Sequence, residues 1–157
     1  MTEVNLDLLR RAIEVARQSR AHGNHPFGAI LVDSKGAILL EAENSVITDR
    51  DVTGHAELNL IRLASQQLDR SSLAECTLYA STEPCAMCAG SIFWSGVGKV
   101  VYGLSEMGLL EIVGDSAPDS FLALPCRDVF VHGHRSIEVA GPLLEDEARQ
   151  VHADFWR

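Results

Sequence analysis

The sequence predicts a three-layer α/β/α domain built around a mixed five-stranded sheet. Its first apolar residues recur every three to four positions, as in an amphipathic helix. Two short β-type segments then flank Ser34-Lys35-Gly36, which suits a hairpin of antiparallel strands. A strand, helix, strand series follows and favours parallel pairing through a right-handed crossover, so the sheet must be mixed. With 157 residues, the chain is expected to form one domain over 1–157.

The N-terminal part of the chain is expected to form a helix and then a hairpin. Leu6, Leu9 and Ile13 fall on one helix face, and Gly23 is typical of the position after a helix end. The segments FGAILVD and AILLEAEN are rich in the residues that strands prefer. The expected elements are a helix over 5–22 and strands over 27–33 and 37–44.

The rest of the chain continues the alternation of helices and strands. Apolar residues cover most of the circumference of the next helix, which indicates packing against a sheet. Glycine and proline interrupt 104–134, so this segment is expected to be the least regular. The expected elements are helices over 55–68 and 85–95, strands over 76–81, 97–103 and 136–141, and a terminal helix over 143–156.

Composition and charge restrict the class of partner and the compartment. The formal net charge is −9, and no basic cluster exceeds Arg10-Arg11, which disfavours binding to nucleic acid. Neither a signal-peptide pattern nor a membrane-length apolar run is present, so we expect a cytoplasmic protein with reduced thiols. Metal binding is then a more natural role than disulfide formation for its cysteines, which are Cys76, Cys85, Cys88 and Cys126.

Polar residues occupy the start of the apolar helix that follows Gly54. His55 and Glu57 are two positions apart, and in mid-helix this spacing would direct their side chains to nearly opposite sides. They can share a site at the helix entrance, where Gly54 lets the backbone leave helical geometry. The start of this helix is therefore a candidate site.

A second candidate site lies at the start of the next helix. Pro84 suits a first helical position, which places Cys85 and Cys88 on the same face of the first turn. The helix dipole there favours thiolate, the form that binds metal.

Together the two helix starts predict a catalytic zinc site. His55, Cys85 and Cys88 supply three ligands for Zn²⁺ and leave a fourth position to water. Zinc lowers the pKa of bound water, and Glu57 is the natural group to move the released proton. A structural zinc site would need a fourth protein ligand, for which Cys76 and Cys126 are the candidates. A redox role for the C-x-x-C pair would leave the His-x-Glu pair unexplained.

The combination H-x-E and P-C-x-x-C resembles the signature of the cytidine-deaminase-like superfamily. The resemblance runs from about Leu9 to Trp156 and is strongest to the branch of bacterial guanine deaminases, fungal-type cytosine deaminases and tRNA adenosine deaminases. It implies the cytidine-deaminase-like fold, a Zn²⁺ cofactor and hydrolytic loss of ammonia. Glu57 would then protonate first the ring nitrogen and afterwards the leaving amine. It also implies a homodimer.

The branch and the substrate are harder to assign. HPFGAILV, DRDVTGHAELNLIR and CAGSIFW look most like guanine deaminases, although Val52 replaces their usual proline, while the terminal GPLLEDEARQVHADFWR looks more like the tRNA enzymes. We expect a small free nucleobase as substrate, with guanine (giving xanthine) first. A tRNA adenosine deaminase is the alternative, and a cytosine-type enzyme comes third. From another class, a non-catalytic zinc-stabilised binding module would not need Glu57.

The candidate base-binding residues come mainly from the resemblance. It assigns Asn44 to hydrogen bonding with the base, and Phe27 and Trp94 could stack on it; a turn asparagine and a core phenylalanine are the alternatives. Guanine presents adjacent N–H donors, which a carboxylate accepts well, and guanine deaminases carry a similar acidic stretch. The carboxylates available for this in 107–121 are Glu111, Asp115 and Asp119, which could equally face water.

Overall fold

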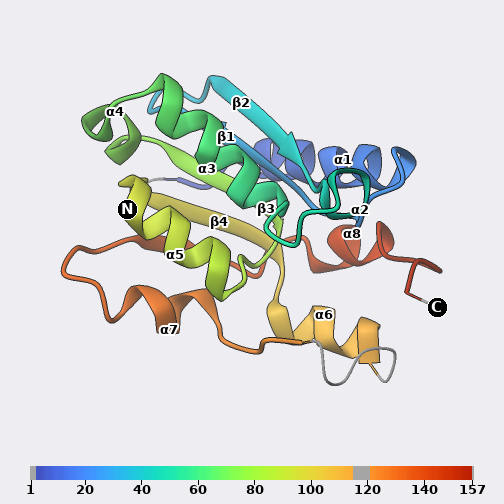
Figure 1. Ribbon diagram of the computed structural model, residues 1–157. Helices are drawn as coiled ribbons and strands as arrows, with labels where there is room; N and C mark the ends of the chain where they lie inside the picture. Colours follow the sequence, from blue (N-terminus) through green and yellow to red (C-terminus); the bar gives the residue numbers. More distant parts are fainter. Residues whose placement is uncertain (1–2, 115–120, 157) are drawn as a thin grey trace.

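The computed structural model describes residues 3–114 and 121–156 and confirms the mixed five-stranded sheet between helical layers (Figure 1). The strand order is β2-β1-β3-β4-β5. β1 pairs antiparallel with β2 and β3, whereas β3 with β4 and β4 with β5 are parallel, as the hairpin and crossover patterns predicted. The strands are β1 (Gly28–Val32), β2 (Ile38–Glu43), β3 (Thr77–Thr82), β4 (Lys99–Leu104) and β5 (Glu138–Ala140).

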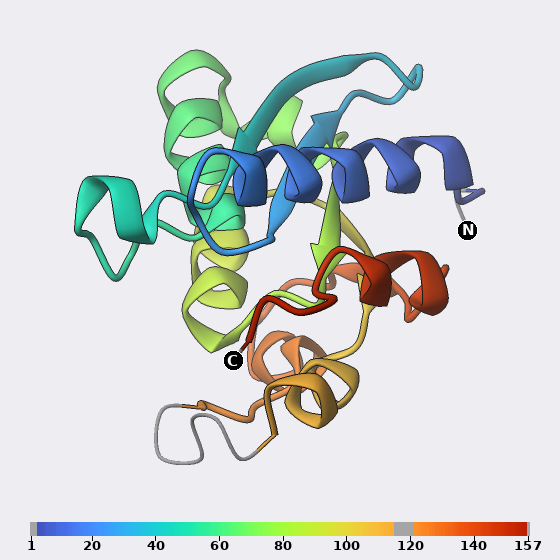
Figure 2. The same cartoon turned by 90° about the vertical axis from the view of Figure 1, so that its right-hand side faces the viewer.

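Two apolar layers cover the sheet. In β1, Ala29 and Leu31 face the core beneath α3, α5 and α7, while Ile30 and Val32 face the core beneath α1 and α8. This alternation follows from the two-residue period of a strand. Figure 2 shows α1 and α8 on the same side of the sheet. These helices are α1 (Leu6–Ala21), α3 (Ala56–Gln67), α5 (Ala86–Ser95), α7 (Cys126–Phe130) and α8 (Glu145–Gln150).

Local interactions explain where the first helix begins and how closely it packs. Asn5 is the N-cap of α1, and its side-chain oxygen accepts hydrogen bonds from the backbone N–H groups of Asp7 and Leu8. Gly28 allows α1 to lie directly on β1, because a Cβ atom there would come within 2.5 Å of the backbone nitrogen of Ala16. The first helix and hairpin therefore agree with the sequence prediction to within one or two residues.

Four parts of the chain differ from the prediction, and the last of them is the terminal helix. Two short helices, α2 (Val46–Asp49) and α4 (Arg70–Ala74), were not expected. The segment predicted as least regular contains α7 and also α6 (Glu106–Val113). In α6, Gly108 packs closely against Leu104, because a Cβ atom there would lie 2.6 Å from Cδ1 of Leu104 and would force that side chain to shift. A glycine that indicated irregular chain is therefore a packing residue inside a helix.

The predicted terminal helix over 143–156 is wrong in length, since α8 spans six residues and turns follow it. The guanidinium group of Arg20 donates hydrogen bonds to the backbone oxygens of Val151 and Ala153, and Asp154 has φ of 61°. These interactions favour turns over a continued helix. No helix in the described ranges, 3–114 and 121–156, combines the length and the apolar character that crossing a membrane requires.

Candidate active site

The metal-binding candidates lie at the starts of α3 and α5, which pack side by side (Figure 1). His55 is the N-cap of α3 with φ −70° and ψ 149°, and Cys85 is the N-cap of α5 with φ −66° and ψ 174°. Both residues therefore have extended backbone just outside a helix. Glu57 and Cys88 follow in the first turns. The prediction that the two groups lie at helix entrances is confirmed, but Pro84 precedes the N-cap Cys85 and does not occupy the first helical position.

The reason for Gly54 differs from the one predicted. Its φ is not positive, so backbone freedom is not what the position requires. A Cβ atom there would lie 2.7 Å from Oγ of Ser45 and 3.1 Å from the backbone oxygen of Asp51. In addition, Ser45 N–H donates a hydrogen bond to the Gly54 carbonyl at 2.8 Å. Gly54 thus permits the preceding loop to pack tightly against the start of α3.

The three predicted metal ligands converge. Nδ1 of His55 lies 3.5 Å from Sγ of Cys85 and 3.6 Å from Sγ of Cys88, and the three atoms all lie within 4.8 Å of one another. Tetrahedral zinc with typical Zn–N and Zn–S bonds separates nitrogen and sulfur ligands by about 3.5 Å. The donor types and the distances therefore both fit Zn²⁺.

The other two cysteines do not join this cluster. Within 3–114 and 121–156, the triad is the one group of His, Cys, Asp or Glu side chains with metal-binding spacing. Sγ of Cys76 donates a hydrogen bond to the Ser72 carbonyl at 3.3 Å. Cys126 is buried at the start of α7, where burial and the negative charge of Glu83 raise its pKa to about 12. These positions argue against a fourth cysteine ligand.

The cysteine pair shares one proton in the metal-free protein. Hydrogen bonding with Cys88, together with His55 and against the opposing effect of burial, lowers the pKa of Cys85 to about 4. The hydrogen bond to Cys85 and burial raise the pKa of Cys88 well above its usual range. Zinc requires both sulfurs as thiolates, so zinc binding would release the remaining proton.

Glu57 is placed and tuned to move a proton. Its side chain is buried, and burial together with the negative charge of Cys85 raises its pKa to about 7. His55 acts in the opposite direction, and a bound cation would also lower the pKa. A carboxyl group that titrates near neutral pH can both accept and return a proton.

A mainly apolar cavity of about 390 Å³ opens onto these groups. Phe27 lies on its wall, as the stacking hypothesis requires, and Glu57 is also part of the lining. Among the described lining residues none is Lys or Arg, whereas three are glutamates. The lining comprises Phe27, Val52, His55, Glu57, Thr82, Glu83, Cys85, Met87, Glu106, Leu109, Phe121 and Leu122.

Two of the other predicted base-binding residues lie away from this lining. Trp94 is 77% exposed and is not part of it, because nine residues of helix rise separate it from Cys85 by roughly 13 Å. Glu111 is exposed and forms a 3.0 Å ion pair with Arg149. The structure therefore does not bring these two side chains to the cavity.

The remaining residues predicted to contact the base are Asn44, Asp115 and Asp119. Asn44 is buried beside the cavity wall, where its backbone N–H donates to the Phe27 carbonyl and its Oδ1 accepts from the Val46 N–H. It lies outside the cavity lining, and its role stays a prediction. Asp115 and Asp119 lie outside the described residues.

Sequence reasoning missed several polar groups on the cavity wall. Thr82 is the last residue of β3, Glu83 follows it, and Glu106 begins α6. Oε1 and Oε2 of Glu83 accept hydrogen bonds from the backbone N–H groups of Glu106 and Cys126, which ties α6 and α7 to the metal-binding loop. A sequence signal for α6 existed in Ser105, whose side chain caps the helix by accepting from the Gly108 N–H.

Comparison with known proteins agrees with the site. Residues 2–104 match the family model of the cytidine and deoxycytidylate deaminase zinc-binding region. A probable cytosine deaminase of Schizosaccharomyces pombe is 44% identical over 99% of this chain and 94% of its own length. The guanine deaminase of Bacillus subtilis is 40% identical over 73% of this chain and 71% of its own length.

Two further relatives extend the comparison to RNA editing and to solved structures. The tRNA-specific adenosine deaminase of Haemophilus influenzae is 37% identical over 67% of this chain and 61% of its own length. A solved guanine deaminase from Nitrosomonas europaea superposes with a TM-score of 0.77 at 25% identity, covering 96% of this chain and 84% of that one. With the geometry of His55, Cys85, Cys88 and Glu57, these matches establish that the chain belongs to the cytidine and deoxycytidylate deaminase family and is a zinc-dependent hydrolytic deaminase.

Proposed function

We propose that this enzyme deaminates a free nucleobase, with guanine as the first substrate and xanthine and ammonia as products. The observation that carries the proposal is the cavity itself, in which the metal ligands and Glu57 are reached through apolar walls without Lys or Arg among the described lining residues. Such a cavity suits a small neutral ring. It offers no cationic group for the phosphates of a nucleotide or of tRNA.

The residues of this chain divide the reaction between them. Zinc held by His55, Cys85 and Cys88 would supply Lewis-acid activation of water. Glu57 accepts a proton from the attacking water and passes it to the ring nitrogen beside the amino-bearing carbon. The same carboxylate then takes the remaining proton from the added hydroxyl group and delivers it to the departing amine, so that water and the base give the oxo product and ammonia. The apolar wall at Phe27 contacts the base and excludes bulk water.

Cytosine is the second candidate, and a specific observation favours it. The S. pombe relative described as a probable cytosine deaminase aligns over 99% of this chain, whereas the B. subtilis guanine deaminase aligns over 73%. Guanine is supported by the PFGA and GHAE segments and by the structural likeness to the N. europaea enzyme. The net charge of −9 supports neither substrate over the other, but it disfavours tRNA.

Ammonia release from a substrate panel tests the proposal. The zinc-loaded enzyme should show its highest kcat/KM with guanine, then cytosine, and should act poorly on adenine, nucleosides and tRNA. Preference for tRNA, with steeply salt-dependent sub-micromolar binding, would instead support the alternative function of a tRNA adenosine deaminase. Absence of ammonia from every compound would instead favour a zinc-stabilised binding module.

Assembly and location complete the proposed function. We expect a homodimer, on the basis of the family resemblance, and light scattering at several protein concentrations measures this directly. Cytoplasmic activity is expected from the reduced state that thiolate zinc ligands require. Fractionation of cells that express the full chain would test it.

A further inference from the structure

Two polar side chains on the cavity wall have no part in the chemistry described above. Thr82 is 5% exposed, and its Oγ1 atom is buried without a hydrogen-bond partner. Glu106 is also 5% exposed. Both line the cavity that contains Glu57 and Cys85. A buried polar atom without a partner is costly, so an unpaired hydroxyl on a substrate cavity indicates a contact that the substrate completes.

The sheet holds these two residues on the same wall. Thr82 is the last residue of β3 and pairs in register with Leu104, the last residue of β4. Glu106 follows Leu104 by two positions and begins α6. The N–H of Glu83 donates to the Leu104 carbonyl at 2.7 Å, which locks the two strand ends together. Their relative position is therefore determined by the parallel ladder.

One oxygen of Glu106 is occupied and the other is available. Oε1 accepts a hydrogen bond from the Leu124 N–H at 3.0 Å, and no further hydrogen bond to this carboxylate occurs among the described residues. A carboxylate has acceptor capacity for more than one donor. Accepting a second hydrogen bond from a substrate would favour the ionised form of this buried group.

A free base carries a matching edge that a nucleoside lacks. The nitrogen that joins a sugar in nucleosides bears hydrogen in the free base, and an acceptor lies beside it. In cytosine these groups are N1–H and O2. In guanine the corresponding donor is N9–H, whereas the neighbouring N3 is the ring nitrogen that Glu57 protonates. A carboxylate accepts the N–H of either base, and a threonine hydroxyl can donate to O2 of cytosine. We propose that Glu106 and Thr82 together recognise this edge and make the enzyme select free bases over nucleosides and N-alkylated bases.

This inference rests on the proposed free-base function and narrows its substrate class. A sugar or methyl group on the ring nitrogen would remove the donor and leave the Glu106 carboxylate facing an apolar group. The enzyme would then have to bury an unpaired charge, which strongly disfavours the substituted base.

The decisive variant is Glu106→Gln. The single amide oxygen of glutamine can replace Oε1 in the hydrogen bond from Leu124, which leaves the NH₂ group, a donor, toward the cavity. The amide NH₂ group of the variant and the N–H group of the base would then face each other as two donors without an acceptor. We expect kcat/KM for the preferred base to fall at least tenfold, with zinc content and Tm retained. For the N-methylated base, 9-methylguanine or 1-methylcytosine, we expect wild type and variant to be equally poor.

Thr82→Val is the second variant, since it removes the hydroxyl at nearly constant volume. A three- to tenfold loss with cytosine and little change with 1-methylcytosine are expected. Glu75→Gln, an exposed residue outside this cavity, is the matched control and should equal wild type. If Glu106→Gln retains wild-type discrimination between free and methylated base, the inference is wrong. An inactive wild type would instead contradict the proposed function, so the two failures are distinguishable.

Discussion

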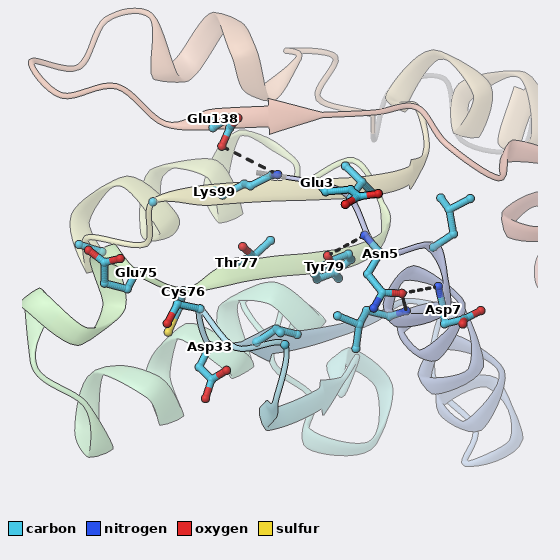
Figure 3. A pocket seen from close by; sticks show the side chains of 18 residues that line it. Glu3, Asn5, Asp7, Asp33, Glu75, Cys76, Thr77, Tyr79, Lys99 and Glu138 are labelled. Carbon is cyan, nitrogen blue, oxygen red and sulfur yellow. Dashed lines mark hydrogen bonds and ion pairs between the residues drawn. The ribbon is translucent and has the colours of Figure 1, made fainter. Parts of the chain in front are cut away.

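Two hollows lie at opposite ends of the sheet, and their polar side chains have different roles. The catalytic cavity of about 390 Å³ lies at the carboxyl ends of β3 and β4, whereas a larger groove of about 690 Å³ lies at their amino ends (Figure 3). In the groove, Nζ of Lys99 lies 3.9 Å from Oε2 of Glu138. Asn5 caps α1, and the thiol of Cys76 donates a hydrogen bond to a backbone carbonyl. These polar groups therefore stabilise the fold.

The two hollows differ in whether their polar side chains converge on one point, and the difference in volume is not what matters. At the catalytic end the N-termini of two helices direct a histidine and two cysteines to one point, with a buried glutamate beside them. The carboxyl ends of parallel strands favour this arrangement, because the chain leaves β3 there and enters α5 within a few residues. The four predictions below test this contrast, beginning with the largest expected effect.

Removal of one ligand should abolish metal binding at the catalytic end only. We expect about one zinc per chain in wild type by elemental analysis, and essentially none in Cys85→Ser, because a hydroxyl is a much poorer zinc ligand than a thiolate. Cys76→Ser, the matched cysteine in the groove, should retain full zinc and activity. Zinc loss in Cys76→Ser would show that the two ends are not independent.

Replacement of the buried glutamate should separate catalysis from metal binding. Glu57→Gln should keep zinc and fold but lower kcat by about 10²- to 10⁴-fold, the usual contribution of a general acid–base group. Glu75→Gln in the groove should leave kcat unchanged. Turnover of Glu57→Gln at the wild-type rate on the best substrate would refute the proton-transfer role.

A buried histidine near Phe27 should make stability depend on pH. His152 is 1% exposed, and burial together with the charge of Arg20 lowers its pKa to about 4. Between pH 4 and 6.5 the unfolded chain therefore binds more protons at this histidine than the folded one. The contribution of His152 to the free energy of unfolding is fully present above about pH 6.5 and is lost as the pH falls toward 4. This group alone should remove about 2 kcal/mol of unfolding free energy between pH 7 and pH 5.

His152→Gln is the variant that isolates this effect. Its amide oxygen can still accept the hydrogen bond that the Trp156 indole donates to Nδ1 at 3.0 Å, but it has no charge to gain. Urea denaturation at pH 7 and pH 5 should show a smaller pH dependence in the variant by about 2 kcal/mol. Equal pH dependence in the two proteins would mean that His152 is not the titrating group.

The smallest effect is expected from the groove. Asn5→Ala removes the cap of α1 and should lower the free energy of unfolding by about 1 kcal/mol. Zinc content and kcat/KM should not change, because α1 contributes no described residue to the cavity lining. A loss of activity with retained stability would reveal communication between the two ends that the structure does not explain.

Much of this protein follows from local patterns in its sequence. The helix and strand periods predicted the sheet and most of its helices, and the spacing within His55-x-Glu57 and Cys85-x-x-Cys88 predicted the zinc site. Each of these patterns is local to one helix or strand, where sequence separation determines which side chains are neighbours.

The cavity wall was decided by the tertiary structure. Phe27, Thr82 and Glu106 come from three strand or helix ends that are distant in sequence, and the parallel register of β3 and β4 brings the last two together. The same packing leaves Trp94 at the surface and directs Glu111 to Arg149. Residue type alone could not separate Glu106 from Glu111, because both are glutamates of one short helix and only the packing of that helix determines which carboxylate is buried.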